Sequence, residues 1–141
     1  MKWLLLLTAS IHLASSADLK SVQTEPNLER RSERALDYAS EVLTNLRTDV
    51  ESKDWSKVSA ELADFRAGVD LCVESLKSTR KTARRNPKYF KKAEVRLREL
   101  GRRLKGLQQL LHVDDLTKMG NLIEYVDQVQ DDLVNLTMGV R

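Results

Sequence analysis

The chain has 141 residues, of which 41% are hydrophobic, 32% charged and 5% aromatic, with five Gly, two Pro and one Cys. This length allows one domain, or one domain and a processed segment. The scarcity of Gly, Pro and aromatic residues argues against a β-sandwich or barrel. The lone Cys excludes an intramolecular disulfide framework and a Cys-rich zinc site. The net charge of +3 is too small to indicate a partner.

The N-terminus is typical of a cleavable secretory signal peptide. Lys2 gives a short positive start, the apolar segment WLLLLTASIHL begins at Trp3, and small residues precede the expected cleavage after Ala17. The apolar segment is shorter than the roughly 20 residues that a membrane-spanning helix needs. We therefore expect residues 1–17 to be removed, the protein to be exported to the periplasm or outside the cell, and the mature form to have no transmembrane segment. The alternative is an N-terminal helix that packs on the domain.

Apolar residues at helical spacing predict one helix over about 28–50, after a polar, flexible lead at 18–27. The spacing indicates a broad apolar stripe that no Pro or Gly interrupts. The stripe comprises Leu28, Ala35, Ala39, Val42 and Leu46, with Leu36, Leu43 and Val50 beside it.

The next two predicted helices, at about 54–80 and 87–111, each carry apolar residues in alternating steps of three and four. This is the a/d pattern of a heptad repeat, sustained over three heptads. The second stripe is Trp55, Val58, Leu62, Phe65, Val69, Cys72 and Leu76, and the third is Phe90, Ala93, Leu97, Leu100, Leu104, Leu107 and Leu111.

A fourth helix is expected at about 115–138, with Leu116, Met119, Ile123 and Val126 facing inward and Val129, Leu133, Leu136 and Val140 continuing the stripe. Short connections favour antiparallel neighbours. The chain is therefore predicted to be all-α, an antiparallel up-down four-helix bundle over residues 28–141. A three-helix coiled-coil-like rod with a loosely attached first helix is the alternative. The apolar stripes could also pack against those of a second chain, so oligomerisation is possible.

Charge is strongly segregated along the chain. The segment from Arg80 to Lys105 contains twelve basic and two acidic residues and has a net charge of +10. Residues 114–132 have a net charge of −5. The heptad positions place Arg96 and Arg103 beside the core, within reach of neighbouring acids, and leave other cations facing outward. The excess positive charge is either neutralised by acidic residues of neighbouring helices or forms an anion-binding surface. The candidate anion-binding residues are Arg84, Arg85, Lys88, Lys91, Lys92, Arg98, Arg102 and Lys105.

Motifs for catalysis and cofactor binding are missing from the sequence. The mature chain would keep a single His, His112, and no Gly-rich phosphate loop, nucleophile elbow or zinc motif occurs. Cys72 lies within an apolar stripe and is interpreted as a buried small side chain. Glu124, Asp127 and Asp131 could offer oxygen ligands to a hard cation, which leaves a metal-dependent enzyme as an alternative. We predict no catalytic residues, no metal and no cofactor.

The segment from Asn86 to Leu116 resembles a segment of uncharacterised exported bacterial helical-bundle proteins. Its recurring elements are Asn86-Pro87-Lys88, Lys92-Ala93-Glu94, Arg102-Arg103-Leu104 and Asp114-Asp115. The resemblance implies a bacterial origin and an envelope or extracellular location, and it implies no activity.

The sequence therefore favours an exported, non-enzymatic helical protein that acts by binding a protein or an anionic component of the cell envelope. Nucleic acid is an unlikely partner because export separates the protein from most of it, and because aromatic residues for base stacking are few. A lipid-associating protein of amphipathic helices is a further alternative.

Overall fold

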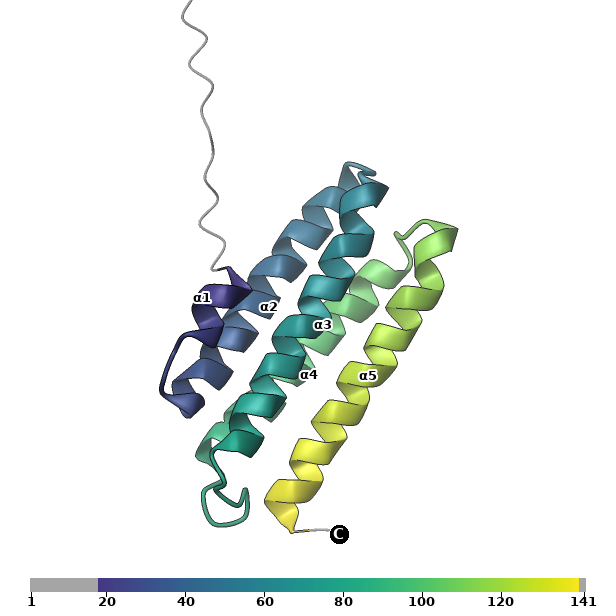
Figure 1. Ribbon diagram of the computed structural model, residues 1–141. Coiled ribbons are helices and arrows are strands. Elements are labelled where there is room, and N and C mark those ends of the chain that lie inside the picture. Colours follow the sequence, from purple (N-terminus) through teal and green to yellow (C-terminus); the bar gives the residue numbers. More distant parts are fainter. Residues whose placement is uncertain (1–17, 140–141) are drawn as a thin grey trace, which may run out of the picture.

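The computed structural model describes residues 18–139, and all regular secondary structure in this part of the chain is helical. Four long helices lie side by side and a short one packs against them (Figure 1). The all-α prediction is confirmed, and the long helices begin and end within three residues of the expected bounds. The helices are α1 (Leu19–Gln23), α2 (Leu28–Glu51), α3 (Trp55–Ser78), α4 (Lys88–Gln108) and α5 (Val113–Met138). The signal peptide prediction falls on residues 1–17, outside the described residues.

The polar segment before α2 contains a short helix where a flexible lead was expected. The Asp18 carboxylate caps α1 by accepting a hydrogen bond from the Lys20 backbone N–H at 3.3 Å. Val22 is fully buried in the common core, and Leu19 packs against that core. A single buried Val among polar neighbours gives no periodic signal, so composition alone could not reveal this anchor.

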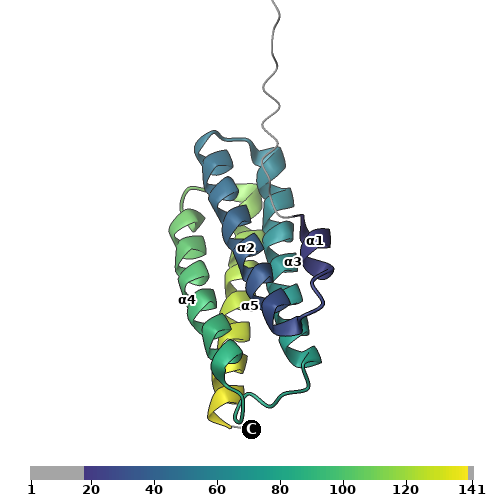
Figure 2. The ribbon, with the colours of Figure 1, turned by 90° about the vertical axis from the view of Figure 1, so that its left-hand side faces the viewer.

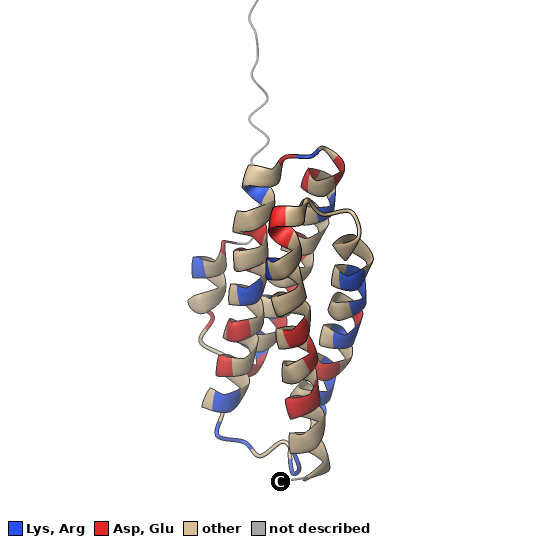
Figure 3. Ribbon diagram, turned by 90° about the vertical axis from the view of Figure 1, so that its right-hand side faces the viewer, with Lys and Arg blue, Asp and Glu red and all other residues tan. Residues whose placement is uncertain are grey.

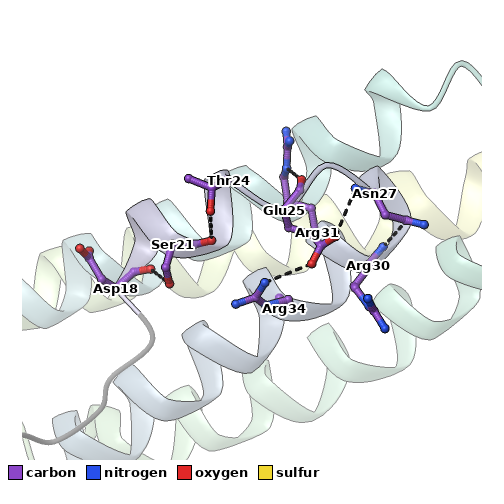
Figure 4. A network of polar contacts seen from close by, with 8 residues as sticks. All are labelled: Asp18, Ser21, Thr24, Glu25, Asn27, Arg30, Arg31 and Arg34. Atoms are coloured by element: carbon purple, nitrogen blue, oxygen red, sulfur yellow. Dashed lines mark hydrogen bonds and ion pairs between the residues drawn. The ribbon is translucent and has the colours of Figure 1, made fainter.

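Glu25 organises the connection from α1 to α2 (Figure 4). Its carboxylate accepts a hydrogen bond from the Asn27 backbone N–H at 3.3 Å and forms an ion pair with Arg34 at 3.1 Å. Its backbone carbonyl accepts from Arg31 Nε at 2.8 Å. The Asn27 side chain in turn caps α2 through the Arg30 N–H at 2.9 Å. These bonds fix the angle at which α2 begins.

The core is formed by the inward faces of all four long helices. Every residue of the stripe predicted for α4 is buried, and the α2 and α3 stripes are buried except at Leu28 and Trp55, which are half-buried. The α5 stripe was wrong at Leu116 and Leu136, which are 38% and 47% exposed, and its last predicted member, Val140, lies outside the described residues. A step of four back from Met119 places Asp115, not Leu116, on the inner face.

The long helices form two antiparallel hairpins, α2–α3 and α4–α5, which lie beside each other with α2 next to α4 and α3 next to α5 (Figures 1 and 2). The two neighbouring pairs that join the hairpins, α2 with α4 and α3 with α5, run parallel. The contacts Lys92–Glu33 and Arg96–Asp37 join positions separated by a constant 59 residues, as two parallel helices require.

The expected antiparallel arrangement of neighbours thus holds within each hairpin and fails between the hairpins. The reason lies in the connection between Ser78 and Lys88, which crosses the end of the molecule from α3 to α4 (Figure 2). Its nine residues could span about 30 Å when extended. Packed helix axes are only about 8–10 Å apart. A connection of this length allows α3 and α4 to lie at diagonal corners.

Candidate anion-binding surface

The outward face of α4 carries a row of residues, the basic stripe, in which every member except Val95 is basic. Its members follow one another in steps of three and four, the spacing of residues on one helix face. All of them are exposed. The basic stripe consists of Lys88, Lys91, Val95, Arg98, Arg102 and Lys105. At 1.5 Å per residue it is about 25 Å long. The apolar residues on the opposite side of α4 are buried in the core, so packing holds the stripe toward solvent.

A second row of α4 cations faces α2 and is matched there. Arg96 forms an ion pair with Asp37 at 2.6 Å and donates to the Glu33 backbone carbonyl at 3.2 Å. Lys92 forms an ion pair with Glu33, and this hydrogen bond and charge raise the Lys92 pKa. Arg103 donates to two α2 hydroxyl groups at 2.9 and 3.1 Å. These contacts agree with the expected core-proximal positions of Arg96 and Arg103, and they place Lys92 beside α2 and outside the basic stripe.

Two members of the basic stripe also have acidic partners. Arg98 contacts Glu94 one turn earlier on α4, and Lys105 contacts Asp127 of α5 at 3.1 Å. Lys88, Lys91 and Arg102 form no ion pair within residues 18–139, although Lys88 lies 5.4 Å from the centroid of its neighbour's ring, that of Tyr89. Exposed pairs of this kind contribute little to stability. The stripe therefore keeps an excess of unmatched positive charge.

The two candidate arginines of the α3–α4 connection lie near the start of the basic stripe. Arg84 and Arg85 are exposed, and neither forms an ion pair among the described residues. The Arg84 Cδ lies 3.2 Å from the position that a Cβ on Gly139 would occupy, so its side chain covers the end of α5. A helix C-terminus carries partial negative charge, which favours a cation there. The connection, the start of α4 and the end of α5 meet at this end of the molecule (Figure 2).

A groove of about 290 Å³ lies between α4 and the last turns of α5. Val95 and Met138 are 56% and 70% exposed, so apolar surface is open to solvent among cations. The groove was not predicted from the sequence, and its one sequence signal is Val95, an apolar residue within the basic row of α4. The groove is lined by Lys91, Glu94, Val95, Arg98, Val134, Thr137 and Met138.

Acidic residues on α5 lie beside the basic face of α4 (Figure 3). Asp127 pairs with Lys105, and it was one of three residues considered as oxygen ligands, with Glu124 and Asp131. Within residues 18–139, no three His, Cys, Asp or Glu side chains are grouped closely enough to hold a metal ion. The acids of α5 thus lie where they can offset part of the α4 charge.

Two titratable groups lie away from the basic stripe. Cys72 is fully buried, and burial raises the pKa of its thiol to about 12, as suits an unreactive core side chain. Burial raises the pKa of Glu61 to about 8, with a further contribution from the Asp49 carboxylate on α2. One Glu61 carboxylate oxygen is buried without a hydrogen-bond partner in the described structure. The carboxyl pair Glu61–Asp49 was not foreseen from the sequence.

No protein-family model matches the chain, and comparisons with curated proteins and with solved structures gave no match either. None of the helices within residues 18–139 is long and apolar enough to cross a membrane.

Proposed function

We propose that the protein is an exported four-helix bundle, built from two antiparallel hairpins, that acts without catalysis by binding an anionic partner in the cell envelope. The binding surface is the basic stripe of α4 together with Arg84 and Arg85. The observation that carries the proposal is that Lys88, Lys91 and Arg102 lie on one exposed helix face without an acidic partner within residues 18–139. Unmatched like charges repel one another, and an anion that contacts several of them relieves this repulsion.

The ion pairs of the α4 cations favour a binding surface over a face that only contacts water. The acids of α2 match the inner row of α4 cations at Lys92 and Arg96, so this fold does place carboxylates opposite cations. Within residues 18–139, the outer row is matched only at Arg98 and Lys105. Attraction of an anionic partner to such a row should weaken steeply with salt.

Retention of the purified protein on an anionic matrix, eluted with a salt gradient, tests the proposal. The test variant carries Lys88→Glu, Lys91→Glu and Arg102→Glu. We expect its affinity to fall by about tenfold or more near physiological salt, since three contacts are reversed. The matched control reverses three exposed lysines that lie outside α4 and form no ion pair within residues 18–139, and it has the same net charge: Lys20→Glu, Lys53→Glu and Lys77→Glu. Equal elution of the two variants would show that net charge alone, and no particular surface, causes retention.

Export is proposed from the signal-like residues 1–17 and is tested separately by the intact mass of the native protein. A chain that starts at Asp18 would keep every described helix, including the cap of α1. We expect the mass of residues 18–141. A native protein that retains Met1 to Ala17 would contradict cleavage.

A further inference from the structure

We propose that the groove between α4 and the end of α5 binds the surface of a bilayer that contains anionic lipids. This inference rests on the anion-binding function proposed above and names the class of anion, the phosphate of a lipid headgroup. Val95 and Met138 enter the interfacial region of the bilayer, while Lys91 and Arg98 at the rim of the groove contact headgroups.

The exposed apolar side chains distinguish a lipid surface from a soluble polyanion. Val95 and Met138 are 56% and 70% exposed, and Val134, one turn before Met138 on α5, also lines the groove. A polyanion offers charge to the cations but little apolar surface to these side chains. The interfacial region of a bilayer offers both, and surfaces that combine Lys or Arg with apolar side chains bind there.

The cations are arranged to meet a flat surface. Lys88, Lys91, Arg98 and Arg102 lie along one face of a straight segment of α4, over about 21 Å at 1.5 Å per residue. Their long aliphatic stems can lie along apolar surface while the charged groups reach phosphates. Several such cations held close to an anionic surface act together.

The acids of α5 end before the groove begins. Asp131 and Asp132 are the last acidic residues of this helix, and residues 133–139 carry none. The groove is therefore bordered on its α5 side by Val134, Thr137 and Met138. Glu94 is the one acid in its lining, is buried, and is bonded to Arg98 and Gln130. A negatively charged membrane meets little repulsion at this end of the molecule.

A second set of exposed apolar residues provides an internal control. Leu110 and Val113 lie at the turn between α4 and α5 and are 55% and 69% exposed. Their nearest charged neighbours in the sequence are Asp114 and Asp115, with no cation between Lys105 and Lys118. Apolar exposure at this turn is comparable. Two arginines line a pocket with Leu110, but Arg47 is paired with Glu51 and Arg103 is bonded to two hydroxyl groups on α2. The described part of this turn therefore lacks a row of unpaired cations like that on α4.

Sedimentation with lipid vesicles tests the proposal, using phosphatidylcholine vesicles with and without phosphatidylglycerol. We expect the protein to bind only the vesicles that contain phosphatidylglycerol. The double variant Val95→Ser with Met138→Ser keeps all charges, and its vesicle affinity should fall about fivefold or more. The control variant Leu110→Ser with Val113→Ser should bind as the parent protein does. Circular dichroism of each variant checks that the helices are retained.

The anionic matrix separates the failure of this inference from the failure of the proposed function. The Val95→Ser, Met138→Ser variant should elute from the matrix at the parent's salt concentration, because its cations are unchanged. A parent protein that binds the matrix but no vesicles would overturn the membrane proposal and leave anion binding standing, with a soluble polyanion as the partner. Vesicle binding that is unaffected by the two serines would also overturn it. A parent protein that binds neither would overturn both proposals.

Discussion

Gly68 lies where α3 packs closely against α2, and replacing it with alanine tests how much room this contact leaves for a methyl group. A Cβ at Gly68 would lie 3.0 Å from Tyr38 Cδ1, 3.2 Å from the Ala35 carbonyl oxygen and 3.2 Å from Ala39 Cβ. Favourable carbon contacts lie at about 3.5–4.0 Å. The Tyr38 ring can rotate away, but the other two atoms belong to the α2 backbone or are fixed to it. Relief therefore requires α2 and α3 to move apart.

The Gly68→Ala variant should lose stability despite its better helix propensity. Overpacking of a buried contact costs about 1–3 kcal/mol, and replacing Gly with Ala inside a helix returns up to about 1 kcal/mol. We expect a net loss of about 1–2 kcal/mol in the free energy of unfolding. Urea denaturation followed by circular dichroism measures this as a lower midpoint at an unchanged slope.

Gly120→Ala and Gly106→Ala are the matched controls. Both glycines lie inside helices, and a Cβ at either position would meet no atom within 4 Å. These variants should gain about 0.5–1 kcal/mol from propensity alone. If Gly68→Ala proves as stable as Gly120→Ala, then the close approach of α2 and α3 is wrong.

Three further predictions concern buried or paired groups. Glu61 has a folded-state pKa of about 8 against an ordinary 4.5, so the folded state binds the proton more tightly and stability should fall as pH rises between these values. Glu61→Gln should therefore gain thermal stability over the parent as pH rises through this window, whereas Glu99→Gln should show no such trend. Cys72 should resist thiol reagents in the native protein and react only on unfolding, and rapid native labelling would contradict its burial. A double-mutant cycle on Lys92 and Glu33 should give a coupling of about 0.2–1 kcal/mol, and a coupling of zero would show that this ion pair does not stabilise the fold.

The sequence could predict what each helix buries, but not which helices touch. Leu97 and Leu104 of α4 are seven residues apart, as are Val58 and Phe65 of α3, and all four are buried because periodicity depends only on local helix geometry. The pairing of α2 with α4 depends on how the connection from Ser78 to Lys88 crosses the molecule, and its length permits either arrangement. Long-range packing decided between them.

The sequence predicted which cations belong to the candidate site, but only part of how they are arranged and what they contact. Heptad positions correctly separated Arg96, which faces α2, from Arg98, which faces solvent. They could not show that Lys92 reaches Glu33, since this contact depends on the parallel packing of α2 and α4. Nor could they show that Met138 lies near Lys91, because α4 and α5 come together only in the folded hairpin.

The arrangement of charge on α4 implies a conflict between stability and binding that a single substitution can expose. Val95 lies one turn after Lys91 and three residues before Arg98, so Val95→Glu would place a carboxylate within reach of both cations. Each such pair contributes about 0.2–0.5 kcal/mol on a helix surface. The exposed Glu99, four residues further along, would repel the new carboxylate by a similar amount, so the gain of about one pair remains. Glu also has the higher helix propensity. The variant should therefore be about 0.5 kcal/mol more stable than the parent, yet bind an anionic matrix and phosphatidylglycerol vesicles more weakly. A less stable Val95→Glu variant would mean that the charges of the basic stripe are already balanced, which would remove the physical basis for an anion-binding surface on α4.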